Sequence, residues 1–135
     1  MTIVVDASFA GAWILPDEHS AEADKVLAVA LRGKEQLAAP ESWTYEILNL
    51  IVSAGRRGRI DTNELERAVR LIERIPVEFY DHQSHAIQNR VLRLALRFSL
   101  SAYDAAYLEL ADRLQCPLRS LDSNLAAAAR SLGLV

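Results

Sequence analysis

The first residues constrain the fold of this chain more than any other stretch. Ile3, Val4 and Val5 form an unbroken apolar, β-branched run, which is typical of a strand buried on both faces of a parallel sheet. Asp6 ends this run, and the residues after it are predicted to be helical up to Pro16. A carboxylate in this place lies where open α/β sheets bind ligands. Alternatively, Asp6 only caps the helix that follows.

Hydrophobic spacing along the rest of the chain predicts strands that alternate with pairs of helices. The predicted strands cover residues 3–5, 36–39, 76–80 and 117–121. The predicted helices cover residues 7–15, 16–31, 40 to 55 or 58, 61 to 74, 83–98, 101–115 and 123–132. This order favours an α/β fold with a parallel sheet that helices cover on both faces.

The length and composition of the chain limit its class. With 135 residues, of which 51% are hydrophobic, we expect one domain over residues 1–135. The apolar runs are too short for a membrane span and the first residues show no secretion signal, so we expect a cytoplasmic protein. The single cysteine, Cys116, excludes an internal disulfide and a multi-cysteine zinc site.

Charge is unevenly distributed along the chain. The formal net charge of −3 by itself argues against binding a polyanion. Residues 54–100, however, contain nine arginines and only six acids. The middle of the chain is therefore locally basic, while its ends are acidic.

Glu46 is the second acid of interest, in the helix after the second predicted strand. At the helical period it shares a polar stripe with Ser42, Asn49 and Ser53, beside an apolar stripe that includes Trp43. This stripe is expected to border the core. The alternative is an ordinary exposed glutamate.

Asp104 and Asp122 complete the set. Asp104 lies in a segment that is apolar on nearly all sides, and a buried, unpaired carboxylate needs a metal, a cation or donors. Ser101 and Asp104 together resemble a capping box, but capping does not explain so apolar a setting. Asp122 ends the strand 117–121 and begins the last helix, so it repeats the arrangement of Asp6, and N-capping is again the alternative.

A parallel sheet should bring these four acids to the same edge. Their charges would repel and raise some of their pKa values without a counter-ion. Mg²⁺ or Mn²⁺, a hard cation that prefers carboxylate oxygens, suits such a set. The histidines do not suit zinc, and we interpret His19, His82 and His85 as surface residues. The four acids are Asp6, Glu46, Asp104 and Asp122.

Four motifs of this chain resemble the PIN-domain family, and within it the VapC-type toxins of toxin–antitoxin modules. The resemblance covers nearly the whole chain, and the motifs occur in the family's order and spacing. The motifs are Val4-Val5-Asp6-Ala7-Ser8, Pro40 with Glu46-Ile47-Leu48-Asn49, Ser101-Ala102-Tyr103-Asp104-Ala105-Ala106-Tyr107, and Ser120-Leu121-Asp122 with Leu125. It implies a PIN-like three-layer α/β/α sandwich with a short, mainly parallel central sheet and helices on both faces.

The resemblance also implies a function. It implies a Mg²⁺-dependent endoribonuclease that forms a homodimer and is blocked by a cognate antitoxin. The four acids would then be catalytic and bind the metal, with Asp6 and Asp104 as the most dependable ligands. Ser8 and Ser120 match positions that usually carry a hydroxyl and could orient a carboxylate or a water.

The expected reaction is metal-assisted hydrolysis of a phosphodiester bond. Single-stranded or looped RNA is the expected substrate, because its bases can be splayed out and held. Candidates for holding its backbone are Arg56, Arg57, Arg59, Arg90, Arg93 and Arg97. These arginines could equally be solvated side chains or contacts to the antitoxin.

Other phosphate-handling classes fit the sequence less well. A haloacid-type hydrolase needs an acid where this chain has Ser8, and a receiver domain needs an acidic pair near the first strand. A P-loop enzyme is excluded because the chain has no glycine-rich Walker motif. A non-catalytic PIN-like module that binds RNA or protein is the alternative to the nuclease.

Overall fold

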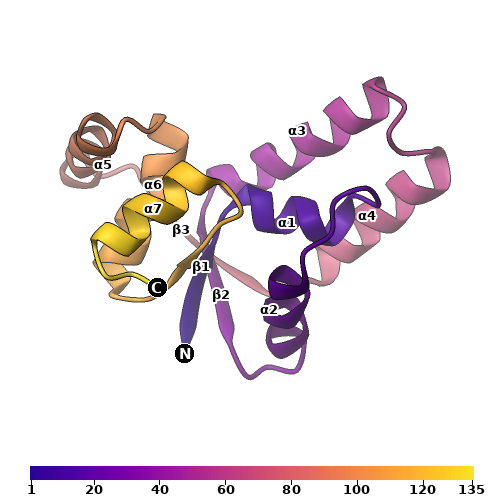
Figure 1. The fold of residues 1–135 in the computed structure, drawn as a ribbon, viewed down its shortest axis with the longest axis horizontal. Coiled ribbons are helices and arrows are strands. Elements are labelled where there is room, and N and C mark those ends of the chain that lie inside the picture. The colour runs from indigo at the N-terminus through magenta and orange to yellow at the C-terminus, as the bar shows by residue number, and fades with distance from the viewer.

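The structure, a computed structural model, describes residues 1–135 and is built on a four-stranded parallel sheet (Figure 1). The strands are β1 (Thr2–Val5), β2 (Gln36–Pro40), β3 (Val77–Tyr80) and β4 (Leu118–Arg119). They lie in the order β3-β2-β1-β4, and each neighbouring pair is parallel. The central strand β1 therefore lies between β2 and β4.

Seven helices connect and follow these strands. Helices α1 (Ala7–Ile14) and α2 (Ala21–Leu31) join β1 to β2, and α3 (Ser42–Arg56) and α4 (Thr62–Arg74) join β2 to β3. Helices α5 (His85–Phe98) and α6 (Ala102–Leu114) lead to β4, and α7 (Ser123–Ser131) follows it. The predicted alternation of one strand with two helices is confirmed. No helix is long and apolar enough to cross a membrane.

The sheet separates two hydrophobic clusters, because neighbouring side chains of a strand point to opposite faces. Ile3 and Val5 pack with Phe9 of α1 and Val26 of α2 in a cluster of nine buried residues. Val4 belongs to the other cluster, of 22 buried residues, to which α3, α6 and α7 contribute. The predicted three-layer α/β/α architecture is confirmed, with β1 buried on both faces as its apolar run indicated.

The parallel pairing places the carboxyl ends of β1, β2 and β4 at the same end of the sheet. Val4 pairs with Ala38 of β2 and with Leu118 of β4, so the three strands run side by side in the same direction. Their carboxyl ends point upward in Figure 1, where α1 and α3 begin. Acids that follow these strands are therefore held at a common edge.

Two sequence predictions of local structure are wrong. Helix α2 begins at Ala21 and not after Pro16, because the Ser20 hydroxyl caps it by accepting the Ala23 N–H at 3.2 Å. The segment 101–103 is exposed, although the whole helix was expected to be buried; α6 is buried mainly from Ala105 to Ala111.

Candidate functional site

Asp6 lies at the carboxyl end of β1 and is almost fully buried, with 4% of its surface exposed. Its Oδ1 accepts hydrogen bonds from the Ser8 hydroxyl at 2.6 Å and from the Phe9 N–H at 3.2 Å. Its Oδ2 accepts one from the Ser120 hydroxyl at 2.5 Å. Burial raises the pKa of Asp6 despite these bonds, and the charge of Asp104 adds to the rise. Asp6 therefore caps α1, and its two carboxylate oxygens are both held by hydrogen bonds.

The two serines join the turn after β1 to the turn after β4. Besides donating to Asp6, the Ser8 hydroxyl accepts the Leu121 N–H at 2.8 Å. The Ser120 hydroxyl accepts the Asp122 N–H at 3.0 Å. Because each hydroxyl donates to Asp6 and accepts from the backbone of the β4–α7 turn, the pair fixes the orientation of this carboxylate.

Glu46 extends from α3 and is half-buried. The hydroxyl of Tyr107, on α6, donates to Glu46 Oε2 at 2.7 Å. Burial raises the pKa of Glu46, and the charges of Asp104 and Asp6 raise it further. Tyr107 is a functional candidate that the sequence analysis missed, although it stands three residues after Asp104 and therefore on the same side of α6.

Asp104 is half-buried near the start of α6. The Ser101 hydroxyl accepts the Asp104 N–H at 3.1 Å, so Ser101 caps the helix as expected. The structure shows no capping box at this helix, so the predicted resemblance to one is only partly realised. Burial raises the pKa of this carboxyl, and the charge of Asp122 raises it further.

Asp122 caps α7, because its Oδ1 accepts the Leu125 N–H at 2.9 Å. Asp122 is the one exposed member of the four acids. The four acids are thus electrostatically linked through Asp104, whose charge interacts with those of Asp6, Glu46 and Asp122. A carboxylate can cap a helix and also act as one of the four acids, because a helix start supplies N–H donors that favour the ionised carboxylate.

A cavity of about 630 Å³ opens beside two of these acids. Glu46 and Asp104 lie in its wall. The complete lining is Ser42, Tyr45, Glu46, Asn49, Ser101, Tyr103 and Asp104. The polar stripe expected on α3 thus faces this cavity, which has the size of an ordinary ligand site.

The chemistry of this group fits a hard divalent cation. Carboxylate and hydroxyl oxygens are the donors that such ions prefer. Mutual repulsion of the acids is the feature that a bound cation would relieve. In this structure no three acids lie close enough together to form a complete metal-ligand set.

The six candidate arginines do not form one surface. Arg56 and Arg57 are exposed and line a second cavity of about 360 Å³, which shares Asn49 with the first. Arg59 instead donates to Asp17 at 2.8 Å and to Glu18 at 3.1 Å. The exposed Arg93 and Arg97 lie on α5, where the Arg97 guanidinium stacks over the ring of Phe98 at 4.8 Å.

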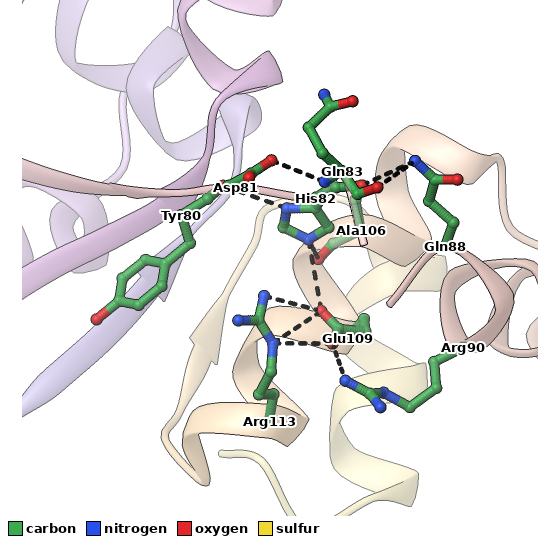
Figure 2. A network of polar contacts seen from close by, with 9 residues as sticks. All are labelled: Tyr80, Asp81, His82, Gln83, Gln88, Arg90, Ala106, Glu109 and Arg113. Atoms are coloured by element: carbon green, nitrogen blue, oxygen red, sulfur yellow. Dashed lines mark hydrogen bonds and ion pairs between the residues drawn. The ribbon is translucent and has the colours of Figure 1, made fainter. Parts of the chain in front are cut away.

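The sixth arginine, Arg90, belongs to a separate network around Glu109, shown in Figure 2. Glu109 of α6 is only 1% exposed, yet two guanidinium groups and the ring of His82 reach its carboxylate. Arg113 approaches Oε1 at 2.9 Å, Arg90 approaches Oε1 at 3.1 Å, and His82 Nε2 approaches Oε2 at 3.4 Å. Burial alone would raise the pKa of Glu109, but the bonds from His82, Arg113 and Arg90 outweigh it and lower the pKa to about 2.

His82 is therefore not the surface residue that we expected, since only 17% of its side chain is exposed. Its Nδ1 lies 3.2 Å from the Tyr80 carbonyl oxygen, and its Nε2 lies 3.3 Å from the Ala106 carbonyl oxygen. Both ring nitrogens thus face acceptors, which favours the doubly protonated ring. The bond to Glu109 is the largest cause that raises the pKa of His82.

Comparisons with known proteins identify the family. A family model for the PIN domain matches residues 3–131. Ribonuclease VapC3 of Pyrobaculum aerophilum is 29% identical over 126 residues, 93% of each chain. VapC ribonuclease Mb0985 of Mycobacterium bovis is 32% identical over 123 residues, 91% of this chain and 87% of that protein.

A solved structure agrees with this match. The crystal structure of PAE2754 from Pyrobaculum aerophilum superposes with a TM-score of 0.67 at 24% sequence identity. The superposition covers 95% of this chain and 84% of that chain, and it shows a shared fold. Because the family match extends over almost all of the sequence, the chain belongs to the PIN domain family.

Proposed function

We propose that the chain is a Mg²⁺-dependent endoribonuclease and the toxin of a VapBC-like toxin–antitoxin system. One observation carries the proposal: Glu46 and Asp104, from two different helices, lie in the wall of one cavity, and the charge of Asp104 raises the pKa values of Glu46 and of Asp6. The relatives that are named VapC ribonucleases support it. The substrate is RNA, in single-stranded or looped segments where a phosphodiester bond can enter the cavity.

The acid group is the proposed metal site, with Mn²⁺ as a possible substitute for Mg²⁺. Asp6, Glu46, Asp104 and Asp122 would hold the cation through their carboxylate oxygens. When bound, such a cation lowers the pKa of a water and stabilises the negative charge that develops on the phosphate. Without it, the acids would repel the phosphate of the substrate.

The chain's own residues position this chemistry. Ser8 and Ser120 hold both oxygens of Asp6, so its orientation is set before the substrate arrives. The Tyr107 hydroxyl donates to one oxygen of Glu46 and so helps to fix the orientation of this carboxylate. Asp104 and Glu46, which cap no helix and line the cavity, are the carboxylates proposed to accept the proton of an attacking water.

Exposed arginines at the C-terminal end of α3 and on α5 are the proposed contacts to the RNA backbone. Arg56 and Arg57 are exposed beside the cavity that continues from Asn49, and Arg93 and Arg97 are exposed on α5. Arginine binds phosphate through its planar set of donors. Arg59 and Arg90 do not have this role, because their guanidinium groups pair with acids of the chain.

Two exposed apolar stripes suit protein partners. Leu48 and Val52 are 42% and 45% exposed on α3, and Leu92 and Leu96 are 56% and 75% exposed on α5. We propose that these faces contribute to a homodimer and to the contact with a cognate antitoxin. In this account the protein acts in the cytoplasm as a single PIN-like domain over residues 1–135.

An RNA cleavage assay tests the proposal. The purified protein is incubated with end-labelled single-stranded and hairpin RNA in Mg²⁺, in Mn²⁺, and in EDTA. Internal cleavage with either metal and none in EDTA is the expected result. Retained RNA binding without cleavage in any of these conditions would instead favour the non-catalytic PIN-like module.

A further inference from the structure

Two exposed tyrosines line the cavity of the acid group. Tyr45 is 78% exposed and Tyr103 is 65% exposed, whereas Phe9, Trp43 and Tyr107 are almost fully buried. Aromatic side chains normally contribute large buried areas to a core or an interface. Both exposed rings therefore offer their faces to a molecule that enters this cavity.

The two tyrosines occupy equivalent places in the sequence. Tyr45 immediately precedes Glu46 on α3, and Tyr103 immediately precedes Asp104 on α6. Successive helix residues point about 100° apart, given 3.6 residues per turn. Each acid is therefore half-buried while the tyrosine before it stays at the exposed rim of the same cavity.

The remaining lining of the cavity is polar. Apart from the two tyrosines and two acids, it consists of Ser42, Asn49 and Ser101. Hydroxyl and amide groups can donate to and accept from the edge of a nucleobase. Flat aromatic faces beside polar groups suit an unpaired base, which stacks on aromatic rings and hydrogen-bonds through its edge.

We propose that Tyr45 and Tyr103 form a stacking subsite for an unpaired nucleobase adjacent to the phosphate that is cleaved. This inference rests on the proposed function and adds that the substrate must present an unstacked base at the cut. From this subsite the strand follows α3 for about three turns, past Asn49 and Ser53, to Arg56 and Arg57.

Binding measurements test the subsite independently of cleavage. The probe is a fluorescein-labelled single-stranded RNA dodecamer, measured by anisotropy with Ca²⁺ in place of Mg²⁺. Tyr45→Ala and Tyr103→Ala should each weaken binding roughly tenfold, within the usual range for one stacked base. Tyr45→Phe and Tyr103→Phe keep the aromatic face and should bind as the unmodified protein does.

Two controls separate stacking from other effects. Leu31→Ala, at an exposed apolar residue of α2, should leave RNA binding unchanged. A fully paired duplex of the same sequence should bind equally to the unmodified protein and to the alanine variants, because it offers no free base. Sedimentation of each variant without RNA records its oligomeric state.

The outcomes are distinguishable. Unchanged affinity of both alanine variants for the single strand would overturn the subsite. An altered oligomeric state of these variants would also overturn it, because the tyrosines would then belong to a contact between two copies of the chain. If the tyrosines prove necessary for binding but no RNA is cut, the base-stacking subsite stands without a cleaved phosphate beside it and the nuclease proposal fails. If both alanine variants cut RNA normally and bind it with unchanged affinity, the nuclease proposal stands and the subsite fails.

Discussion

The Ser120 hydroxyl donates a hydrogen bond to Asp6 Oδ2 at 2.5 Å, across 114 positions of sequence. It thereby connects the end of β4 to the end of β1, and the Ser8 hydroxyl holds the other oxygen of Asp6 at 2.6 Å. The orientation of the most buried acid of the site thus depends on two neutral side chains. Their contribution can be measured separately from that of the acids.

Ser120→Ala removes the bond to Oδ2 and is expected to destabilise the protein by about 1–3 kcal/mol, the range for losing a hydrogen bond to a charged group. Metal-dependent RNA cleavage should fall as well, because Oδ2 of Asp6 is no longer held and only the bonds to Oδ1 from Ser8 and Phe9 remain. Urea unfolding and cleavage rates measure the two effects. Ser123→Ala, on the exposed first turn of α7, is the control, and equal results for both variants would contradict this role of Ser120.

Glu109→Gln should destabilise the fold by about 1.5–3 kcal/mol, the range for hydrogen bonds to a charged group, because the remaining Arg90 side chain is half exposed and stays hydrated. The exposed Glu73→Gln makes the same change of charge on α4 and should have almost no effect. Unfolding curves in urea compare the two variants. In the unmodified protein the stability from Glu109 is complete above pH 4.5 and is lost as the pH falls towards 2, because its pKa in the folded state is lowered to about 2.

The pH dependence of stability expected from His82 is opposite to that expected from Glu109. Its pKa in the folded state is raised above the usual 6.5, so its contribution is fully present below pH 6.5 and is lost as the pH rises through the raised value. The free energy of unfolding should therefore decline above pH 6.5 in the unmodified protein. His82→Gln should remove this decline and His85→Gln, at an exposed neighbour, should keep it; an identical pH profile in all three proteins would contradict the pairing with Glu109.

Arg56→Gln and Arg57→Gln together should weaken RNA binding and its salt dependence. For a single strand, the slope of log K against log salt becomes shallower by about 0.7 for each phosphate that the protein no longer neutralises. Fluorescence anisotropy over a series of salt concentrations gives this slope. Arg32→Gln, at an exposed position that follows α2, is the matched control, and an unchanged slope in the double variant would remove both arginines from the RNA path.

The fold could be predicted largely because its signals are local. The run Ile3 to Val5 and the hydrophobic spacing of the helices follow from which residues are buried, so the order of elements and the parallel sheet could be derived. The start of α2 was misplaced because Pro16 and the acids after it also imitate a helix start. In the structure Asp17 and Glu18 instead bind Arg59, a partner more than 40 positions away.

Contacts between distant residues account for what the sequence did not predict. The sequence near Glu109 supplies only one of its partners, Arg113 on the same helix. His82 and Arg90 approach it from the loop before α5 and from α5 itself (Figure 2). For the same reason the hydroxyl of Tyr107 on Glu46 could not be foreseen. The four acids could be proposed from the sequence because each lies at or near the start of a helix that follows a strand or a loop from the sheet; their role as a metal site stays a prediction.

The central claim is that Asp104 links the four acids into one divalent-cation site. Isothermal titration calorimetry with Mn²⁺ on the unmodified protein, on Asp104→Asn and on Asp112→Asn tests it most directly, since Asp112 lies on the same helix away from the cavity. Asp104→Asn should abolish the binding isotherm while Asp112→Asn retains it, with circular dichroism unchanged in both. Undiminished Mn²⁺ affinity in Asp104→Asn would contradict the assignment.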